Sequence, residues 1–289
     1  MGKGVAECEL VSGVGQLDEM LGPHRRRGSS IGFVPTLGGL HAGHVTLIEA
    51  ARRANDVVVV SVFLNPIQFD DPGDLARYPR DLMADLACAG RAGADIVFAP
   101  SVEAMYPAGR PEVTVDPGAL GAIFEGAARP GHFRGVATIV TKLLALVAPS
   151  YAYFGEKDYQ QLVVVRRLVR DLSLPVEIVA CPTVRDPDGL ADSSRNAFLD
   201  SGERQAATVL YRALCAGAEA VRSGVTDAGE VEVTMRSMVA TEPSVALDYA
   251  RIVADGHLEP LSTVVGDVVL LVAARVGQVR LIDNLRVAR

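Results

Sequence analysis

The chain has 289 residues, of which 49% are hydrophobic and 22% are charged, and its formal net charge is −7. This length and composition are typical of a globular protein with one large domain or two smaller ones. The acidic balance disfavours nucleic-acid binding, since the longest basic tract is Arg25–Arg27, which we expect in a solvated turn. The sequence also lacks an apolar run of membrane-spanning length and a signal-peptide pattern, and its four cysteines are scattered. We therefore expect a cytoplasmic protein with no membrane partner.

Apolar runs and helical patterns alternate through the first two thirds of the chain. Continuous runs such as Val57–Val60 are typical of strands that are buried on both faces of a parallel sheet. The alternation predicts an α/β fold, a Rossmann-like doubly wound parallel sheet that binds ligands at the carboxyl ends of its strands. The expected strands are 30–34, 56–63, 95–98, 151–154 and 176–180, and the expected helices are 44–54, 80–92, 135–147 and 159–172.

The pattern changes after about residue 185. An Ala-rich helical region at about 203–240 precedes strands near 246–254, 267–274 and 278–283. Helices followed by consecutive strands predict a smaller α+β domain. We place the boundary between a first domain, 1–183, and a C-terminal domain, 184–289.

Two histidines lie where the first predicted strand turns into its helix. The segment Pro35–His44 reads Pro-Thr-Leu-Gly-Gly-Leu-His-Ala-Gly-His. Backbone N–H groups at a helix start suit a phosphate, and glycine lets the backbone approach a ligand closely. His41 and His44 can add donors for the same anion. The segment predicts a nucleotide site; the alternatives are a turn that needs glycine only for its geometry, or a metal pair, which no nearby Cys or carboxylate cluster supports.

Polar residues follow two further predicted strands. Asn65 and Gln68 come after the second strand, where neutral amides can orient a hydroxyl or a carboxylate, although Asn65 could equally cap the turn before Pro66. Lys157 follows the strand at 151–154 and can neutralise a phosphate. Asp158 can accept hydrogen bonds from ribose hydroxyls or cap the next helix.

Two other segments combine cations with small residues. Arg129–Gly135 reads Arg-Pro-Gly-His-Phe-Arg-Gly and could be a mobile, anion-facing loop or a solvated surface loop. Ser193, Ser194 and Arg195 lie at the expected domain junction and could form an anion loop, in which either serine could also cap a helix.

Taken in chain order, these segments resemble the pantothenate synthetase (pantoate–β-alanine ligase) family over essentially the whole chain. The runs Gly155–Gln161 and Arg129–Gly135 are specific in combination. The family is one of the nucleotidyltransferases that share a His-x-x-His motif with class I aminoacyl-tRNA synthetases. The resemblance implies that ATP and pantoate give pantoyl adenylate and pyrophosphate, after which β-alanine attacks the acyl carbon and expels AMP.

The resemblance also implies roles for particular residues. The expected phosphate-binding and catalytic residues are His41 and His44, with Lys157, Ser193, Ser194 and Arg195 on the other side of the phosphates. The rest of the ATP site would comprise Pro35, Thr36, Leu37, Gly43, Gly155, Asp158 and Val184. Gln68, Gln161 and Asn65 would bind pantoate, and Asp85 would help to bind Mg²⁺. A homodimer is implied by resemblance alone.

Three positions depart from the family pattern. Leu37 replaces the usual Met, Ala42 replaces a common Glu, and Asp192 places an anion next to the expected phosphate loop. The nearest rival enzyme is another adenylyltransferase. A second alternative is a nucleotide-binding regulator with weakened catalysis, which only Asp192 supports. The expected Gln68 and Gln161 pair argues against the first, because such a clamp fits a small polyhydroxy acid.

Overall fold

The computed structural model describes residues 8–289, which divide into two compact units. Unit 1 contains the described residues up to Gly155 together with Val164–Cys181. Unit 2 contains Glu156–Val163 and Pro182–Arg289. The second unit therefore includes a short segment, Glu156–Val163, that precedes the expected domain boundary.

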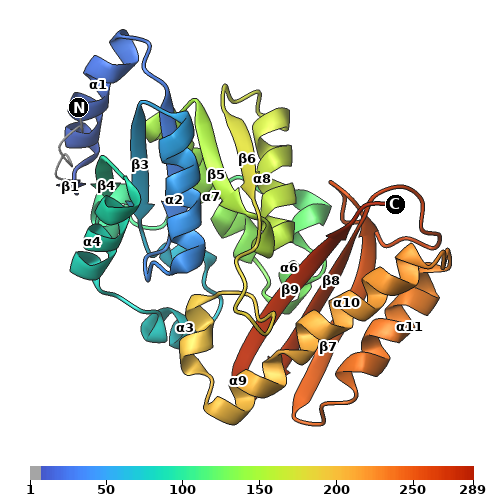
Figure 1. Ribbon diagram of the computed structural model, residues 1–289. Helices are drawn as coiled ribbons and strands as arrows, with labels where there is room; N and C mark the ends of the chain where they lie inside the picture. The colour runs from blue at the N-terminus through green and yellow to red at the C-terminus, as the bar shows by residue number, and fades with distance from the viewer. Residues whose placement is uncertain (1–7) are drawn as a thin grey trace, which may run out of the picture. The chain divides into compact units, whose positions relative to one another are not determined.

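Unit 1 is built on a six-stranded sheet in the order β1-β4-β3-β2-β5-β6, in which every neighbouring pair is parallel (Figure 1). The predicted doubly wound parallel fold is confirmed. The valine run is buried as expected, with Val58, Val59 and Val60 at 0% exposure. The strands are β1 (Glu9–Val11), β2 (Ile31–Thr36), β3 (Val57–Val62), β4 (Ile96–Phe98), β5 (Tyr151–Gly155) and β6 (Glu177–Cys181).

Helices cover both faces of this sheet, with α2 and α7 on opposite sides in Figure 1. α2 packs against α4, and α1 packs against α7. Ile48 of α2 and Ala89 of α4 lie in one buried cluster with Val58 and Val60. The helices are α1 (Val14–Arg26), α2 (Ala42–Ala54), α3 (Pro72–Arg77), α4 (Leu82–Ala92), α5 (Val102–Met105), α6 (Glu125–Ala128), α7 (His132–Val147) and α8 (Tyr159–Asp171), which begins in unit 2, with 3₁₀ turns η1 (Pro66–Gln68) and η2 (Gly118–Gly121).

The N-terminal elements β1 and α1 were not predicted. A three-residue strand is too short to show a periodicity, and the α1 sequence is interrupted by Gly22 and Pro23. The expectation of a solvated turn at Arg25–Arg27 was wrong for Arg25. This residue lies in α1, and its guanidinium donates to the carbonyls of Leu146 and Val147 at the end of α7.

Unit 2 contains an antiparallel sheet in the order β7-β8-β9, and Figure 1 shows α10 and α11 along one face of it. The smaller α+β fold is confirmed. The expected helical region at 203–240 is divided into three helices, and the second break lies at Gly224, which has a φ of +100°. The elements are η3 (Glu156–Asp158), η4 (Ser194–Phe198), α9 (Ser201–Ala207), α10 (Val209–Arg222), α11 (Ala228–Val239), β7 (Val245–Ala254), β8 (Val268–Val276) and β9 (Val279–Val287).

Within residues 8–289, none of the helices has both the length and the apolar character needed to span a membrane.

Candidate active site

The order of the unit 1 strands reverses between β2 and β5, because β2, β3 and β4 extend in one direction and β5 and β6 in the other. The crevice at the carboxyl ends of two such strands is the usual ligand position in an open α/β sheet. β2 is followed by the two histidines, and β5 ends at Gly155. An added Cβ on Gly155 would meet no atom within 4 Å, so the chain is open at this position.

The turn after β2 is held by one buried carboxylate. Asp85 is 4% exposed and accepts hydrogen bonds from the backbone N–H groups of Gly39 (3.0 Å) and Leu40 (2.8 Å). Gly38 has a φ of +93°, and a Cβ on it would lie 3.0 Å from an Asp85 oxygen. The Gly-Gly pair is therefore required by backbone geometry. These contacts give Asp85 a structural role in the turn, and its expected role as a Mg²⁺ ligand stays a prediction.

The two histidines hold each other at the start of α2. His41 is the N-cap, and its Nδ1 accepts from the backbone N–H of Gly43, while the His41 N–H donates to His44 Nδ1, each at 3.3 Å. A ring nitrogen that accepts from a backbone N–H carries no proton. Nε2 is therefore the ring nitrogen of each histidine that can donate to a ligand, and the two ring centroids lie 4.1 Å apart. The motif thus combines a helix cap with two Nε2–H donors at the positive end of the helix.

The turn after β3 carries Gln68 in a buried amide network. Asn65 is 0% exposed, and its Nδ2 donates to Gln68 Oε1 (3.0 Å) and to the carbonyl of Gly135 (3.3 Å). The Tyr106 hydroxyl donates to Asn65 Oδ1 (2.8 Å), and burial raises the pKa of Tyr106 to about 12, which keeps this donor protonated. Since Gln68 Oε1 is already an acceptor, its Nε2 group is the end of the amide that can bind a ligand oxygen. Asn65 makes no capping hydrogen bond, so the alternative of a turn cap before Pro66 was wrong.

The segment Arg129–Gly135 packs against this turn. His132 begins α7, three residues before the expected start, and its Nδ1 lies 2.8 Å from the carbonyl of Gln68. Burial, together with the charge of Arg129, lowers the pKa of His132 to about 4, so the ring is neutral at pH 7 and donates to this carbonyl. A Cβ on Gly135 would lie 2.5 Å from the carbonyl oxygen of Ile67, so only glycine allows α7 to approach so closely.

The two arginines of this segment differ in their contacts, and the expected anion-facing role of the loop stays a prediction. Arg129 forms ion pairs with Asp70 (3.2 Å) and Asp74 (3.7 Å), which makes it part of the local framework. Arg134 is exposed and lines a cavity of about 280 Å³. The cavity lies wholly in unit 1, and its polar lining consists of Gln68, Asp70, Arg110, Thr114, His132 and Arg134.

Pro35 and Thr36 end β2, and Leu37 follows them in unit 1. The expected site residues that belong to unit 2 are Lys157, Asp158, Gln161, Val184, Ser193, Ser194 and Arg195. The Lys157 side chain is 19% exposed and lies 3.5 Å from an Asp158 carboxylate oxygen. Ser193 is the N-cap of η4 and accepts from the backbone N–H of Arg195 (3.3 Å), which confirms one of the two expected serine caps. Val184 accepts from the backbone N–H of Asp192 (2.9 Å).

Comparison with known proteins identifies the family. The pantoate-β-alanine ligase family matches residues 9–286. The chain belongs to the pantoate-β-alanine ligase family. It is 48% identical over 276 residues to the pantothenate synthetase of Moorella thermoacetica, an alignment that covers 96% of this chain and 97% of that protein.

Solved structures of this ligase family share the fold. The pantothenate synthetase of Thermus thermophilus is 50% identical with a TM-score of 0.91, covering 97% of this chain and 100% of that one. The pantoate-β-alanine ligase of Francisella tularensis, solved in complex with β-γ ATP and β-alanine, is 35% identical with a TM-score of 0.77, covering 96% and 97% of the two chains. The family resemblance and the ligase class predicted from the sequence are confirmed.

The cavity that contains Gln68 is also lined by residues that the sequence analysis did not single out. Arg110 and Thr114 line the cavity with Gln68, although they lie in a segment with no predicted element. Asn65 does not line this cavity and donates to Gln68 Oε1, and its expected contact with pantoate stays a prediction. The spacing of three between Asn65 and Gln68 was a usable signal for this contact, because residues three apart meet in a single turn.

Proposed function

We propose that this chain catalyses the ATP-dependent condensation of pantoate with β-alanine, through a pantoyl adenylate, with release of pyrophosphate and AMP. One observation carries the proposal: residues 9–286 match a family whose description names both molecules that are joined. The cavity offers hydrogen-bond donors for an acid substrate, and the histidine pair offers donors for phosphate. The family match favours neither a different adenylyltransferase nor an inactive regulator.

In the first step, an oxygen of the pantoate carboxylate attacks the α-phosphorus of ATP, and the bond to pyrophosphate breaks. The nucleophile is already ionised at pH 7, so no protein base is needed. The protein must instead align the reactants and stabilise the charge that develops on the phosphates. The Nε2–H groups of His41 and His44 are suited to this task, because Nδ1 of each ring accepts from a backbone N–H and Nε2 acts as the donor.

Pantoate is proposed to bind at the Gln68 cavity. The Gln68 Nε2 group donates to a hydroxyl or carboxylate oxygen of the acid, since Asn65 already occupies its Oε1. Arg110 and Arg134 make the lining cationic, which favours an anionic substrate. Gln161 is proposed as a second amide that binds pantoate.

The remaining ATP contacts are also proposals. Lys157 neutralises phosphate charge, and Ser193, Ser194 and Arg195 supply further donors. Gly155 and Asp158 are proposed to contact the ribose, and the backbone at Val184 the adenine. Pro35, Thr36, Leu37 and Gly43 complete the proposed set.

Magnesium is proposed to bind with ATP. Among residues 8–289 there is no cluster of three or more His, Cys, Asp or Glu side chains able to hold a metal ion. We therefore propose that the cation is held mainly by the phosphates of ATP and by water, as Mg²⁺ commonly is. When bound, Mg²⁺ would neutralise charge on the phosphates.

We also propose that the protein is a cytoplasmic homodimer. The four free cysteines are consistent with a reducing compartment. The dimer rests on family resemblance, and sedimentation at micromolar concentration tests it, because a stable monomer would contradict it.

The activity is tested by incubating the protein with ATP, Mg²⁺, pantoate and β-alanine and by measuring AMP and pantothenate. Both products should require all three substrates. With isotopically labelled pantoate and no β-alanine, the label should appear in a small adenylate. Label on the protein would contradict the mechanism, and AMP formation that does not need pantoate would contradict the substrate assignment.

A further inference from the structure

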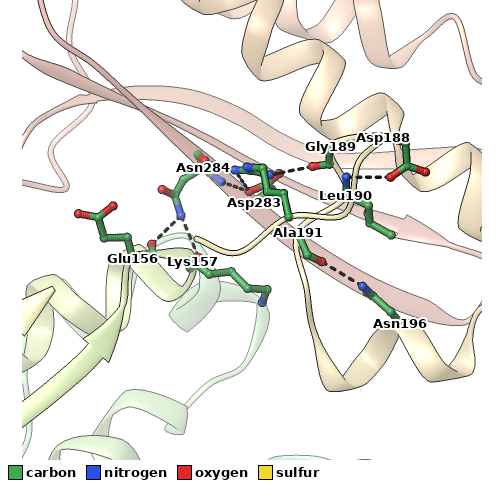
Figure 2. A network of polar contacts seen from close by, with 10 residues as sticks. Glu156, Lys157, Asp188, Gly189, Leu190, Ala191, Asn196, Asp283 and Asn284 are labelled. Atoms are coloured by element: carbon green, nitrogen blue, oxygen red, sulfur yellow. Dashed lines mark hydrogen bonds and ion pairs between the residues drawn. The ribbon is translucent and has the colours of Figure 1, made fainter. Parts of the chain in front are cut away.

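Two adjacent residues of β9 form the centre of a polar network in unit 2 (Figure 2). Asp283 and Asn284 are 5% and 6% exposed, although both are polar. Arg185 donates to both carboxylate oxygens of Asp283, at 2.6 and 2.8 Å. It also donates to the backbone carbonyls of Gly189 (3.1 Å) and Asn284 (2.9 Å), and its guanidinium lies 4.3 Å from the ring centre of Tyr211. These contacts hold the Arg185 guanidinium in a single orientation.

The Asn284 amide connects β9 to the turn that carries Lys157. Its Nδ2 donates to the backbone carbonyls of Glu156 and Lys157, each at 2.8 Å. Figure 2 shows this amide between the strand and the turn, while the Lys157 side chain extends away from it. The backbone N–H of Asn284 in turn donates to Asp283 Oδ1 (2.8 Å). Asp283 thus orders both Arg185 and the residue that holds the turn.

Stability alone does not account for this arrangement. Burial raises the pKa of Asp283 and the hydrogen bonds from Arg185 oppose that rise, so the carboxylate is tolerated only because of its partner. Replacing a buried ion pair by apolar residues of similar volume is often neutral or stabilising. A sheet whose core is otherwise made of aliphatic side chains gains little from such a pair. The network does, however, hold both the Glu156–Lys157 turn and the segment at Gly189 in place.

We propose that Asn284, held in place by Asp283 and Arg185, is a positioning residue that sets Lys157 for the adenylation step. The inference rests on the proposed role of Lys157 at the ATP phosphates. Two hydrogen bonds to consecutive carbonyls fix the orientation of the Lys157 backbone and therefore the origin of its side chain. Because Arg185 also binds Gly189, the same two β9 residues restrain the segment that leads to Ser193–Arg195.

The first test is Asn284→Ala, measured by adenylate formation with ATP, Mg²⁺ and pantoate. We expect turnover to fall about 10- to 100-fold, since a displacement of about 1 Å in a positioned group can reduce a rate that much. The affinity for pantoate should change much less than turnover, because Gln68 belongs to unit 1 and only the proposed second amide, Gln161, follows the Lys157 turn. Leu281→Ala is the matched control: Leu281 lies on the same strand at 6% exposure but packs in the aliphatic core. It should lower the melting temperature and leave turnover within about twofold of the original protein. A similar loss of turnover in Leu281→Ala would overturn the positioning role.

The second test is a double-mutant cycle with Lys157→Ala. If Asn284 acts through Lys157, the double variant should be no slower than Lys157→Ala alone. Independent effects that multiply would overturn the inference but leave the role of Lys157 intact. Unchanged adenylation in Lys157→Ala alone would overturn the proposed role of Lys157, and the inference with it. If Asn284→Ala does not fold, Asn284→Asp is the second variant. It keeps the side-chain shape but presents an oxygen to the two carbonyls, so turnover should fall. Near-normal turnover in Asn284→Asp would also overturn the proposal.

Discussion

The turn at His41–His44 and the turn at Lys157 are built in different ways. The two histidines are held at the start of α2 by hydrogen bonds that span two and three residues. Lys157 lies in a 3₁₀ turn of three residues, whose carbonyls are bound by Asn284, 127 residues further along the chain. The histidine contacts are therefore local, although Asp85 holds the preceding Gly39 and Leu40, whereas the Lys157 turn depends on the folding of the C-terminal sheet. Variants in the histidine turn should act locally, and variants far from Lys157 should still affect it.

The largest expected effect is at the histidine turn. His44→Ala removes an Nε2–H donor and the acceptor for the His41 N–H, so adenylation should fall by at least ~10²-fold. His44→Gln is the matched control, because Gln at this helix position can also accept from the N-cap N–H. It should restore thermal stability without restoring the rate. A normal adenylation rate in His44→Ala would show that the imidazole has only a capping role.

The turn at Gln68 tests the same contrast within unit 1. It belongs to the same unit as the histidines, but it is held by α7, which begins 64 residues further along the chain. Gly135→Ala would place a Cβ 2.5 Å from the Ile67 carbonyl oxygen and force α7 away. We expect a loss of about 1–3 kcal/mol of stability and weaker binding of pantoate. Gly15→Ala, in α1 with no atom near the added Cβ, should instead stabilise the protein by about 0.4–1 kcal/mol. Denaturant unfolding and calorimetry measure both quantities, and an unchanged stability in Gly135→Ala would mean that α7 can move at no cost.

Substitution of Gln68 should weaken the binding of pantoate and not that of ATP. Gln68→Ala removes the proposed donor to pantoate and leaves Asn65 Nδ2 with one of its two acceptors. The affinity for pantoate should fall by about 1–3 kcal/mol, while the affinity for ATP changes little. Calorimetric titration with each substrate distinguishes the two. Weaker ATP binding with unchanged pantoate binding would reverse the assignment.

The smallest expected effect is a pH dependence of stability at His132. Its native pKa of about 4 lies below the ordinary value of 6.5, so the unfolded chain takes up the proton first as the pH falls. The stabilisation is therefore complete above about pH 6.5 and is lost as the pH falls towards 4. Because water screens the partly exposed ring, we expect a loss of about 1–2 kcal/mol over this range.

His132→Asn is the control for this pH dependence, since an amide can donate to the Gln68 carbonyl but does not titrate. Urea unfolding at pH 7 and at pH 4.5 should show a smaller loss of stability for the variant than for the original protein. Equal losses would place the acid sensitivity elsewhere in the chain.

The sequence alone determined the features that depend on neighbouring residues. The Val57–Val60 run predicted a buried parallel strand, since four consecutive apolar residues can be buried only if both faces of the strand are covered. The spacing of three between His41 and His44 predicted that both lie at the helix start, and the cap confirms this placement. A pattern of a few residues was enough to predict both features, because the backbone geometry of a strand or a helix start sets which neighbouring side chains are buried or meet.

Only the tertiary structure determined which side chains hold those features in place. The sequence position of Asp85 does not reveal the Gly39 and Leu40 N–H groups from which its carboxylate accepts hydrogen bonds. Asn284 was not singled out at all, since nothing near it in the sequence points to the Lys157 turn. A hydrogen bond between residues far apart in the chain leaves no periodic pattern, because its partners are brought together only when the strands and helices between them have packed.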